Sequence, residues 1–193
     1  MKTVQVYLVM LLLAVTTVKA QKPTATRNGF PITLSLFSES ISLPTLKHIQ
    51  TGGIGIKIGT ELYYRNRPGS QLIQTLNIGY YRHPRVQTGL FVNSEFGFRK
   101  YFGGLYADAF LGGGALLVRP VSPSYTQDSN TGEYRKAPAT QLKFMPTVNA
   151  GLGYRFHHRT TVFARYELFG EMPFREILLP HQALHLGTRF LFN

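Results

Sequence analysis

Two histidines near the carboxyl end have a spacing that could serve chemistry. His181 and His185 lie four residues apart, His48 lies far upstream, and Ser122 and Ser124 are possible nucleophiles in a polar stretch. A histidine beside a serine can act as base and nucleophile in acyl transfer. On a strand, positions 181 and 185 would share a face but stand ~13 Å apart, too far to bind one metal ion. No serine stands in a His-x-Ser context, so the sequence predicts no catalytic site, no metal site and no cofactor.

The amino-terminal segment predicts export. Lys2 precedes the apolar run VYLVMLLLAV, and Val18-Lys19-Ala20 provides a cleavage site after Ala20. This pattern is typical of a secretory signal peptide, which we assign to residues 1–20. Residues 21–29 form a polar leader, and residues 30–193 are long enough for one domain. The chain has no cysteine, which excludes disulfides and thiol chemistry.

The charge of the chain indicates an anionic partner. The net charge is +12, and removal of segment 1–20, with Lys2 and Lys19 and no acid, leaves +10. Such a charge attracts nucleic acid, anionic lipid or acidic glycan. Export and the lack of a phosphate-binding glycine loop or a metal-finger spacing exclude nucleic acid.

Strands with two different faces account for the stretch TGGIGIKIGTELYYR at 51–65. Lys57 and Glu61 stand at helical spacing, but the glycines around them disfavour a helix. With a period of two, Ile54, Ile56 and Ile58 share one face, and the glycines and charges share the other. The same alternation predicts eight strands, near 30–40, 52–66, 71–83, 87–101, 105–118, 141–156, 160–170 and 185–192.

The glycine-rich charged face indicates an all-β, eight-stranded antiparallel up-and-down transmembrane β-barrel whose apolar face meets lipid. Glycine suits a crowded interior, where acids and bases can pair. We expect a lumen charge network of Lys57, Glu61, Arg65, Glu95, Arg99, Asp108, Arg155, Arg165, Glu167 and Arg189. A soluble secreted barrel that binds an apolar ligand inside is the alternative, because alternation alone does not say which face is wet.

Aromatic residues divide between the two faces. Girdles at the ends of the apolar band, a feature of outer-membrane barrels, are expected from Tyr64, Tyr80, Phe98, Phe156 and Phe192. By the same parity, the interior is plugged by Tyr63, Tyr81, Phe91, Tyr101, Tyr106 and Phe110. A plugged interior makes the charge network structural rather than a conduction path.

Loop lengths set the orientation. With both termini in the periplasm, the periplasmic turns would be 67–69, 102–104 and 157–159, all short, as is usual for these barrels. The external connections would be 41–51, 84–86, 119–140 and 171–182. Pro146 interrupts the strand at 141–156 and predicts a bulge or an edge, which leaves the facing of Lys143 and Met145 open.

Taken together, the eight alternating strands and the ending Arg189-Phe190-Leu191-Phe192-Asn193 resemble the small OmpA/OmpX-type outer-membrane barrels. The resemblance lies in pattern and topology over residues 30–193. It implies insertion in the outer membrane of a Gram-negative cell by the barrel-assembly machinery, whose usual signal ends on an aromatic residue, whereas Asn193 follows Phe192 here. Some barrels of this size are lipid-modifying enzymes, so that activity is a second alternative to a structural or interaction role.

The basic residues outside the strands indicate the partners. Outer-membrane lipids and anionic glycolipid are expected to contact Arg82, Arg85, Arg119, Arg135 and Lys136 at the cell surface. On the periplasmic side, His157, His158, Arg159 and Arg67 could meet phospholipid headgroups. A monomer is expected.

Overall fold

The computed structural model of the chain describes residues 30–41, 52–123, 125–127, 134–136, 138–156, 160–174 and 177–192. The proposed signal peptide 1–20 and the leader 21–29 lie outside these ranges. Within the described part of the chain, no helix is long and apolar enough to cross a membrane.

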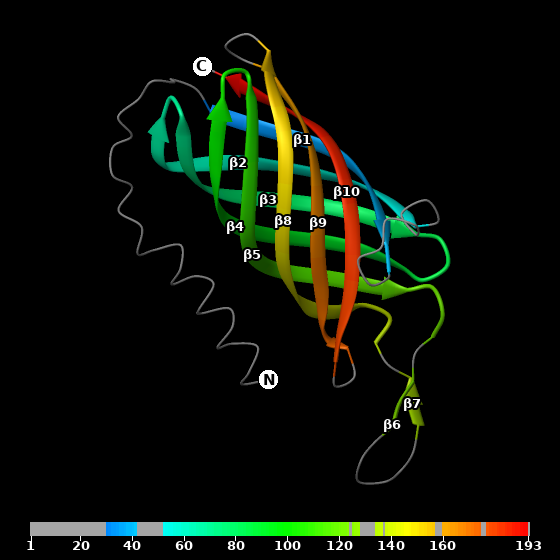
Figure 1. Cartoon of the computed structure of the whole chain (residues 1–193). Helices are drawn as coiled ribbons and strands as arrows, with labels where there is room; N and C mark the ends of the chain where they lie inside the picture. The colour runs from blue at the N-terminus through cyan, green and yellow to red at the C-terminus, as the bar shows by residue number, and fades with distance from the viewer. Residues whose placement is uncertain are drawn as a thin grey trace.

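Eight strands close into one barrel, in the order β1-β10-β9-β8-β5-β4-β3-β2, and every neighbouring pair is antiparallel (Figure 1). Their bounds are β1 (Phe30–Ser40), β2 (Gly53–Arg67), β3 (Ser70–His83), β4 (Gln87–Phe102), β5 (Leu105–Pro120), β8 (Gln141–Phe156), β9 (Thr160–Phe174) and β10 (Ile177–Phe192). The predicted all-β, eight-stranded up-and-down barrel is therefore confirmed. A two-stranded hairpin, β6 (Tyr125–Gln127) with β7 (Tyr134–Lys136), stands apart from the barrel within the predicted loop 119–140.

The barrel has two distinct ends. At one end, which we call the terminal end, Phe30 pairs with Phe192, and tight turns join β2 to β3 and β4 to β5. At the other, the loop end, a turn at 84–86 joins β3 to β4, and the β6–β7 hairpin lies between β5 and β8. The turns at 67–69, 102–104 and 84–86 therefore lie where the sequence predicted them, and 157–159 is outside the described residues.

The predicted long connection at 171–182 is wrong, because both flanking strands continue through it. β9 extends to Phe174 and β10 begins at Ile177, so His181 pairs with Phe169 well inside the ladder. The alternation is hidden there because the outward positions Gly170, Pro180 and Gln182 are not large apolar residues, so the apolar face that marks the other strands is interrupted.

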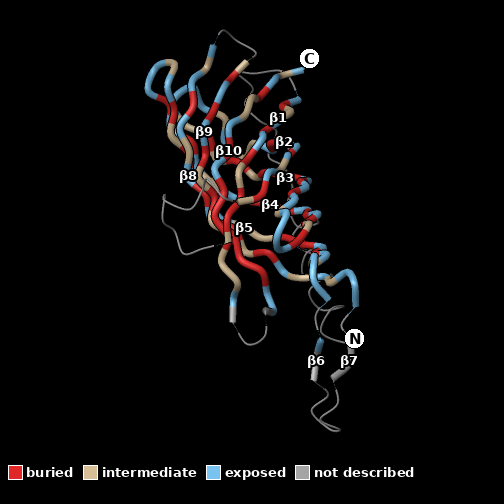
Figure 2. Tube along the Cα trace, turned by 90° about the vertical axis from the view of Figure 1, so that its right-hand side faces the viewer, coloured by how far each residue is buried: buried red, intermediate tan, exposed pale blue. Residues whose placement is uncertain are grey.

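Buried and exposed residues alternate along the barrel strands (Figure 2). The residues that point outward are mostly large and apolar, and they include Leu36, Ile54, Leu76, Leu111, Leu152 and Leu186. The buried side chains are mostly charged, amide or aromatic ones that fill the interior. The structure therefore contradicts the soluble alternative, in which the apolar face would line an internal ligand site.

Interior glycines make room for aromatic rings on the neighbouring strand. Phe91 is the cross-strand partner of Gly79, and a methyl group built on Gly79 would lie 2.2 Å from the Phe91 ring. Tyr81 is likewise the cross-strand partner of Gly89, and a methyl group built on Gly89 would lie 2.2 Å from the Tyr81 ring. The same arrangement recurs in the cross-strand pairs Phe37–Gly55, Phe110–Gly97, Tyr106–Gly153 and Phe163–Gly187. The glycines of the charged face thus allow rings to cover the barrel wall, an arrangement also used to stabilise designed sheets.

A β-bulge in β2 reverses the facing of its last residues. Tyr63 pairs with Ile73, but Arg65 pairs with Leu72, so Tyr64 is an extra residue without a partner of its own. Beyond the bulge, the neutral Asn66 points inward, where its Oδ1 accepts a hydrogen bond from Gln71 Nε2, while Arg65 and Arg67 are exposed on the outside. The inclusion of Arg65 in the lumen charge network is therefore wrong, since one inserted residue moves every following side chain to the other face.

Pro146 neither shifts the register nor marks an edge. It pairs with Gly113 of β5, and β8 keeps the same register with β9 on both sides of it, although the ladder to β9 is interrupted there. The barrel is closed, so β8 has neighbours on both sides. Met145 is fully buried, and Lys143 pairs with the buried Leu116, so both residues face the interior.

Candidate functional site: the charged interior and the basic rims

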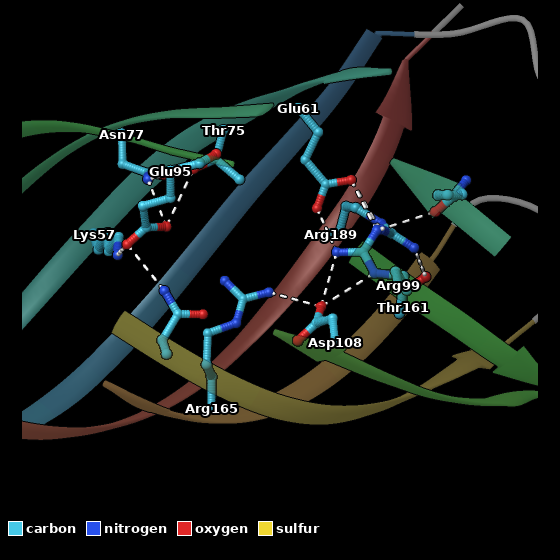
Figure 3. A network of polar contacts seen from close by, with 12 residues as sticks. Lys57, Glu61, Thr75, Asn77, Glu95, Arg99, Asp108, Thr161, Arg165 and Arg189 are labelled. Atoms are coloured by element: carbon cyan, nitrogen blue, oxygen red, sulfur yellow. Dashed lines mark hydrogen bonds and ion pairs between the residues drawn. The ribbon is translucent and has the colours of Figure 1, made fainter. Parts of the chain in front are cut away.

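An arginine cluster, comprising Glu61, Arg99, Asp108, Arg165 and Arg189, fills the interior toward the terminal end (Figure 3). Arg99 lies between two carboxylates, with Nη2 2.7 Å from Glu61 Oε1 and 3.0 Å from Asp108 Oδ2. Arg189 Nη1 donates to Glu61 Oε2 at 2.9 Å, and Arg165 Nη2 donates to Asp108 Oδ2 at 3.0 Å. Two acids therefore join three arginines that come from β4, β9 and β10.

Aromatic and polar groups complete this cluster. The Arg99 guanidinium carbon lies 4.8 Å from the Tyr106 ring centroid, and that of Arg165 lies 4.8 Å from the Phe110 centroid. Tyr63 donates its hydroxyl to Glu61 Oε2 at 2.7 Å. Desolvated cations over aromatic faces are stabilised further, which helps to offset the cost of burying charge.

A lysine cluster, made of Lys57, Glu95, Glu167 and His185, occupies the middle of the barrel. Lys57 Nζ lies 2.7 Å from Glu167 Oε2 and 3.3 Å from Glu95 Oε1. Glu95 also accepts hydrogen bonds from the side chains of Thr75, Asn77, Asn93 and Asn149, at 3.0–3.3 Å. Glu95 is thus partnered at both of its oxygens, as a buried charge requires, and Glu167 is paired through Oε2.

A histidine cluster of Glu39, Lys143, Glu171 and His181 lies toward the loop end. His181 Nδ1 is 2.7 Å from Glu39 Oε1, and His181 Nε2 is 3.8 Å from Glu171 Oε2. Lys143 Nζ lies 3.7 Å from Glu171 Oε1, and Gln87 donates to the same carboxylate at 3.0 Å. The sequence reading missed Glu39 and Glu171. Glu39 could have been found from the alternation of β1, which puts Ser35, Phe37 and Glu39 on one face.

Ser35, His185 and Glu167 have the residue types of a hydrolase triad. Ser35 Oγ lies 3.4 Å from His185 Nδ1, and His185 Nε2 lies 3.2 Å from Glu167 Oε2. The arrangement is closed to substrate, because the three residues are only 5%, 2% and 1% exposed and the His185 ring stacks on Phe37 at 4.6 Å. The three side chains pack and pair inside the barrel.

The other chemical candidates are scattered. His181 and His185 both face the interior from β10, but each contacts a different carboxylate. Ser122 is exposed beyond the end of β5, and His48 and Ser124 lie outside the described residues. Within the ranges that the structure describes, no three His, Asp or Glu side chains are grouped to hold a metal ion.

The aromatic residues lie on the faces that the sequence predicted for them. Buried inside are Tyr81, Phe91, Tyr101, Tyr106 and Phe110, and Tyr63 is partly buried there against Glu61. Tyr80, Phe98, Phe156 and Phe192 are exposed on the outside. Tyr64, the bulge residue, packs edge-on against the outward Phe96 and hydrogen bonds to Gln74.

Arg155, which the sequence placed in the lumen charge network, lies half-buried at the terminal end. Its guanidinium carbon is 4.9 Å from the Tyr101 ring centroid.

The basic residues at the loop end form a short row across three strands. Arg82 of β3 pairs with Thr88 of β4, which pairs with Arg119 of β5, and both arginines are exposed. Arg85 is exposed in the turn between β3 and β4. In the β6–β7 hairpin the backbone of Arg135 pairs with Thr126 and that of Lys136 with Tyr125, and the side chains of Arg135 and Lys136 are not described. His157, His158 and Arg159 also lie outside the described residues.

All acids in the described ranges are interior. Glu39, Glu61, Glu95, Asp108, Glu167 and Glu171 are each buried, and the remaining acids of the sequence fall outside those ranges. The described exterior therefore carries cations without acids. This separation of charge explains how a strongly basic chain can have a nearly balanced interior.

Comparison with known proteins defines the class of fold. No protein-family model and no curated protein sequence matches the chain. Among solved structures, Neisserial surface protein A is similar with a TM-score of 0.51 and 14% identity, covering 86% of this chain and 98% of that one. Ail, the attachment invasion locus protein of Yersinia pestis, in complex with the heparin analogue sucrose octasulfate, has a TM-score of 0.50 and 13% identity, covering 86% of this chain and all (100%) of that one. The chain thus has the fold of the small eight-stranded outer-membrane β-barrels, as the sequence pattern predicted.

Proposed function

We propose that the protein is embedded in the outer membrane, with both termini in the periplasm, and has a structural or interaction role at the cell surface. The observation that carries this proposal is the band of exposed apolar side chains on all eight barrel strands. Water would make such a surface prone to aggregation, whereas lipid solvates it. The closed ladder supports the same conclusion, since a barrel leaves no backbone edge unpaired in lipid.

The loop end supplies the contact with a partner. Arg82, Arg85 and Arg119 are exposed there, and no acid lies on the described exterior to neutralise them. Guanidinium groups bind phosphate through paired hydrogen bonds. The favoured counterpart is therefore the phosphate of an anionic glycolipid in the surrounding outer leaflet.

Cysteine accessibility tests the embedding and the orientation, because the chain has no cysteine of its own. In intact cells, a membrane-impermeant maleimide should label Arg85→Cys at the loop end but not Arg67→Cys at the terminal end. Lysis should make both reactive. Labelling of Arg67→Cys alone in intact cells would show that the termini face outward, contrary to the proposal.

Glycolipid binding can be tested by native mass spectrometry of the detergent-solubilised barrel with bisphosphorylated lipid A. We expect the variant with Arg82→Gln, Arg85→Gln and Arg119→Gln to lose most of the bound lipid. The matched control is the variant with Arg82→Lys, Arg85→Lys and Arg119→Lys, which keeps the three charges and should retain more of the lipid than the glutamine variant. Equal binding by dephosphorylated lipid A would contradict recognition of phosphate.

We further propose that the interior histidines are structural. Ser35, His185 and Glu167 are buried and Glu167 also pairs with Lys57, so a lipid ester would have to displace packed side chains to reach Ser35. Lipid composition in cells that express Ser35→Ala should match that of cells with the wild-type chain. A lipid product that appears with the wild type and disappears with Ser35→Ala would instead establish an enzyme.

A further inference from the structure

The bulge at Tyr64 has a consequence for the outer surface at the terminal end. Because it turns the end of β2 over, Arg65 and Arg67 both project outward, whereas a regular strand would have sent them into the lumen. Tyr64 itself stays on the outside, where its hydroxyl bonds to Gln74 and its ring contacts Phe96. The bulge therefore places two cations on the wall beside an amphipathic aromatic residue.

A third cation completes the group. Arg67 pairs with Ser70 of β3, and Ser70 pairs with Lys100 of β4, so the three residues form one row across adjacent strands. With strands ~4.8 Å apart, the backbones at Arg67 and Lys100 are about 10 Å apart. Such long side chains can converge over the small Ser70. Arg65, Arg67 and Lys100 are all exposed, and within the described ranges all acids are buried. We call these three residues the terminal-end cation group.

The terminal-end cation group borders the apolar band directly. Arg65 shares its row with Leu72 and Phe98, and Phe98 and Phe96 continue along β4 as exposed rings. Leu62 continues the same apolar surface along β2. A molecule bound here would thus meet positive charge at the end of the barrel and an apolar surface toward its middle. This arrangement matches a phospholipid, which has an anionic phosphate at one end and apolar acyl chains at the other.

We propose that Arg65, Arg67 and Lys100 form a binding site for the phosphate of an anionic phospholipid in the periplasmic leaflet, with its acyl chains along Phe98, Phe96 and Leu62. The site rests on the proposed embedding and orientation, and is separate from the glycolipid contact at the loop end. Three cations with no exterior acid favour a headgroup of net negative charge over a zwitterionic one, because a choline or ethanolamine would be repelled.

The absence of tryptophan allows a local test with brominated lipids, which quench tryptophan on contact. Phe98→Trp reports on the site. Phe190→Trp is the control, because β10 lies opposite β4 in the ring of strands and Phe190 is also exposed near the terminal end. Each variant is reconstituted twice in vesicles of phosphatidylcholine and phosphatidylglycerol, once with the phosphatidylcholine brominated and once with the phosphatidylglycerol brominated. The ratio of the quenching in the two samples gives the preference of that position for one lipid over the other.

We expect the Phe98→Trp protein to prefer phosphatidylglycerol by about fivefold at low salt, and the Phe190→Trp protein to show almost no preference. Adding Arg65→Gln, Arg67→Gln and Lys100→Gln should abolish the preference at position 98. Heat-modifiable migration in SDS shows whether the triple change perturbs folding. If it does, the double variant Arg67→Gln with Lys100→Gln, which leaves the bulge residues unchanged, should still lower the preference for phosphatidylglycerol at position 98.

Two results would overturn the site. One is quenching at both tryptophans without a preference for phosphatidylglycerol at position 98. The other is a preference that the glutamine substitutions leave unchanged. Lack of quenching at both positions would overturn the membrane-embedded barrel as well, so failure of the site and failure of the embedding give different results.

Discussion

The guanidinium of Arg99 forms a forked pair with the carboxylate of Glu61, with Nη2–Oε1 at 2.7 Å and Nη1–Oε2 at 3.0 Å. The same carboxylate also accepts from Arg189 at 2.9 Å, so it joins β2 to β4 and β10 across the lumen. A pair of this geometry is among the stronger buried interactions, and it depends on both partners being present.

Loss of the Glu61 charge should destabilise the barrel. Glu61→Gln leaves Arg99 and Arg189 without their shared carboxylate, and breaking a buried pair costs about 3–5 kcal/mol. Denaturant unfolding in lipid vesicles, followed by the gel shift between folded and unfolded barrel, measures the change. Arg65→Gln on the same strand is the control and should stay within about 0.5 kcal/mol in vesicles of phosphatidylcholine alone, which lack an anionic headgroup for Arg65 to bind, because Arg65 is exposed. Equal losses for both would contradict the structural assignment.

Glu95 should matter for stability without controlling a pore. It contacts Lys57 and four hydrogen-bond donors, so Glu95→Gln should lower the free energy of unfolding by about 3 kcal/mol or more. The buried rings and charged clusters still fill the interior, so neither protein should conduct steadily in planar bilayers. Large, stable currents from the wild type would show that the interior is open.

The outward face of β2 should tolerate a cation only near its end. Ile58 is exposed between Leu34 and Ile78, and Ile58→Arg should cost about 2–4 kcal/mol if it lies near the bilayer midplane. Ile54→Arg, on the same face but beside Arg82 at the loop end, should cost about 0–1 kcal/mol. The same unfolding assay in vesicles gives both values. A larger penalty at Ile54 than at Ile58 would argue against this depth assignment.

The glycine beneath Phe91 should resist substitution for lack of space. In Gly79→Ala the new methyl would lie 2.2 Å from the ring, so we expect a loss of about 1–3 kcal/mol. A second change, Phe91→Leu, should reduce the effect of the alanine, and a double-mutant cycle measures that coupling. Gly69→Ala is the control, since nothing lies within 4 Å of its methyl position. If the effects of Gly79→Ala and Phe91→Leu on the free energy of unfolding were strictly additive, the Phe91 ring would not be the cause of the loss in Gly79→Ala.

The sequence by itself determined the class of fold and the facing of most strand residues. Side chains alternate across a strand whatever its neighbours are, so the run from Ile54 to Leu62 specified an apolar and a polar face. The glycines among the charges further indicated that the polar face was the crowded one, and the ring of Phe37 now accounts for Gly55 of this run. This local rule was enough to predict the barrel.

Only the tertiary structure decided which polar groups meet and where the alternation fails. Ser35 and His185 are 150 positions apart, and their contact depends on closure of β1 against β10, which no local pattern encodes. The outward turn of Arg65 arises because β3 offers one residue fewer than β2 at the bulge, a property of the pair of strands. The hidden alternation at Glu171 and His181 became visible only once β9 and β10 were paired, because the register places both side chains inside the barrel, with His181 Nε2 3.8 Å from Glu171 Oε2. Facing is a local property of a strand, whereas register and partnership are properties of the closed sheet.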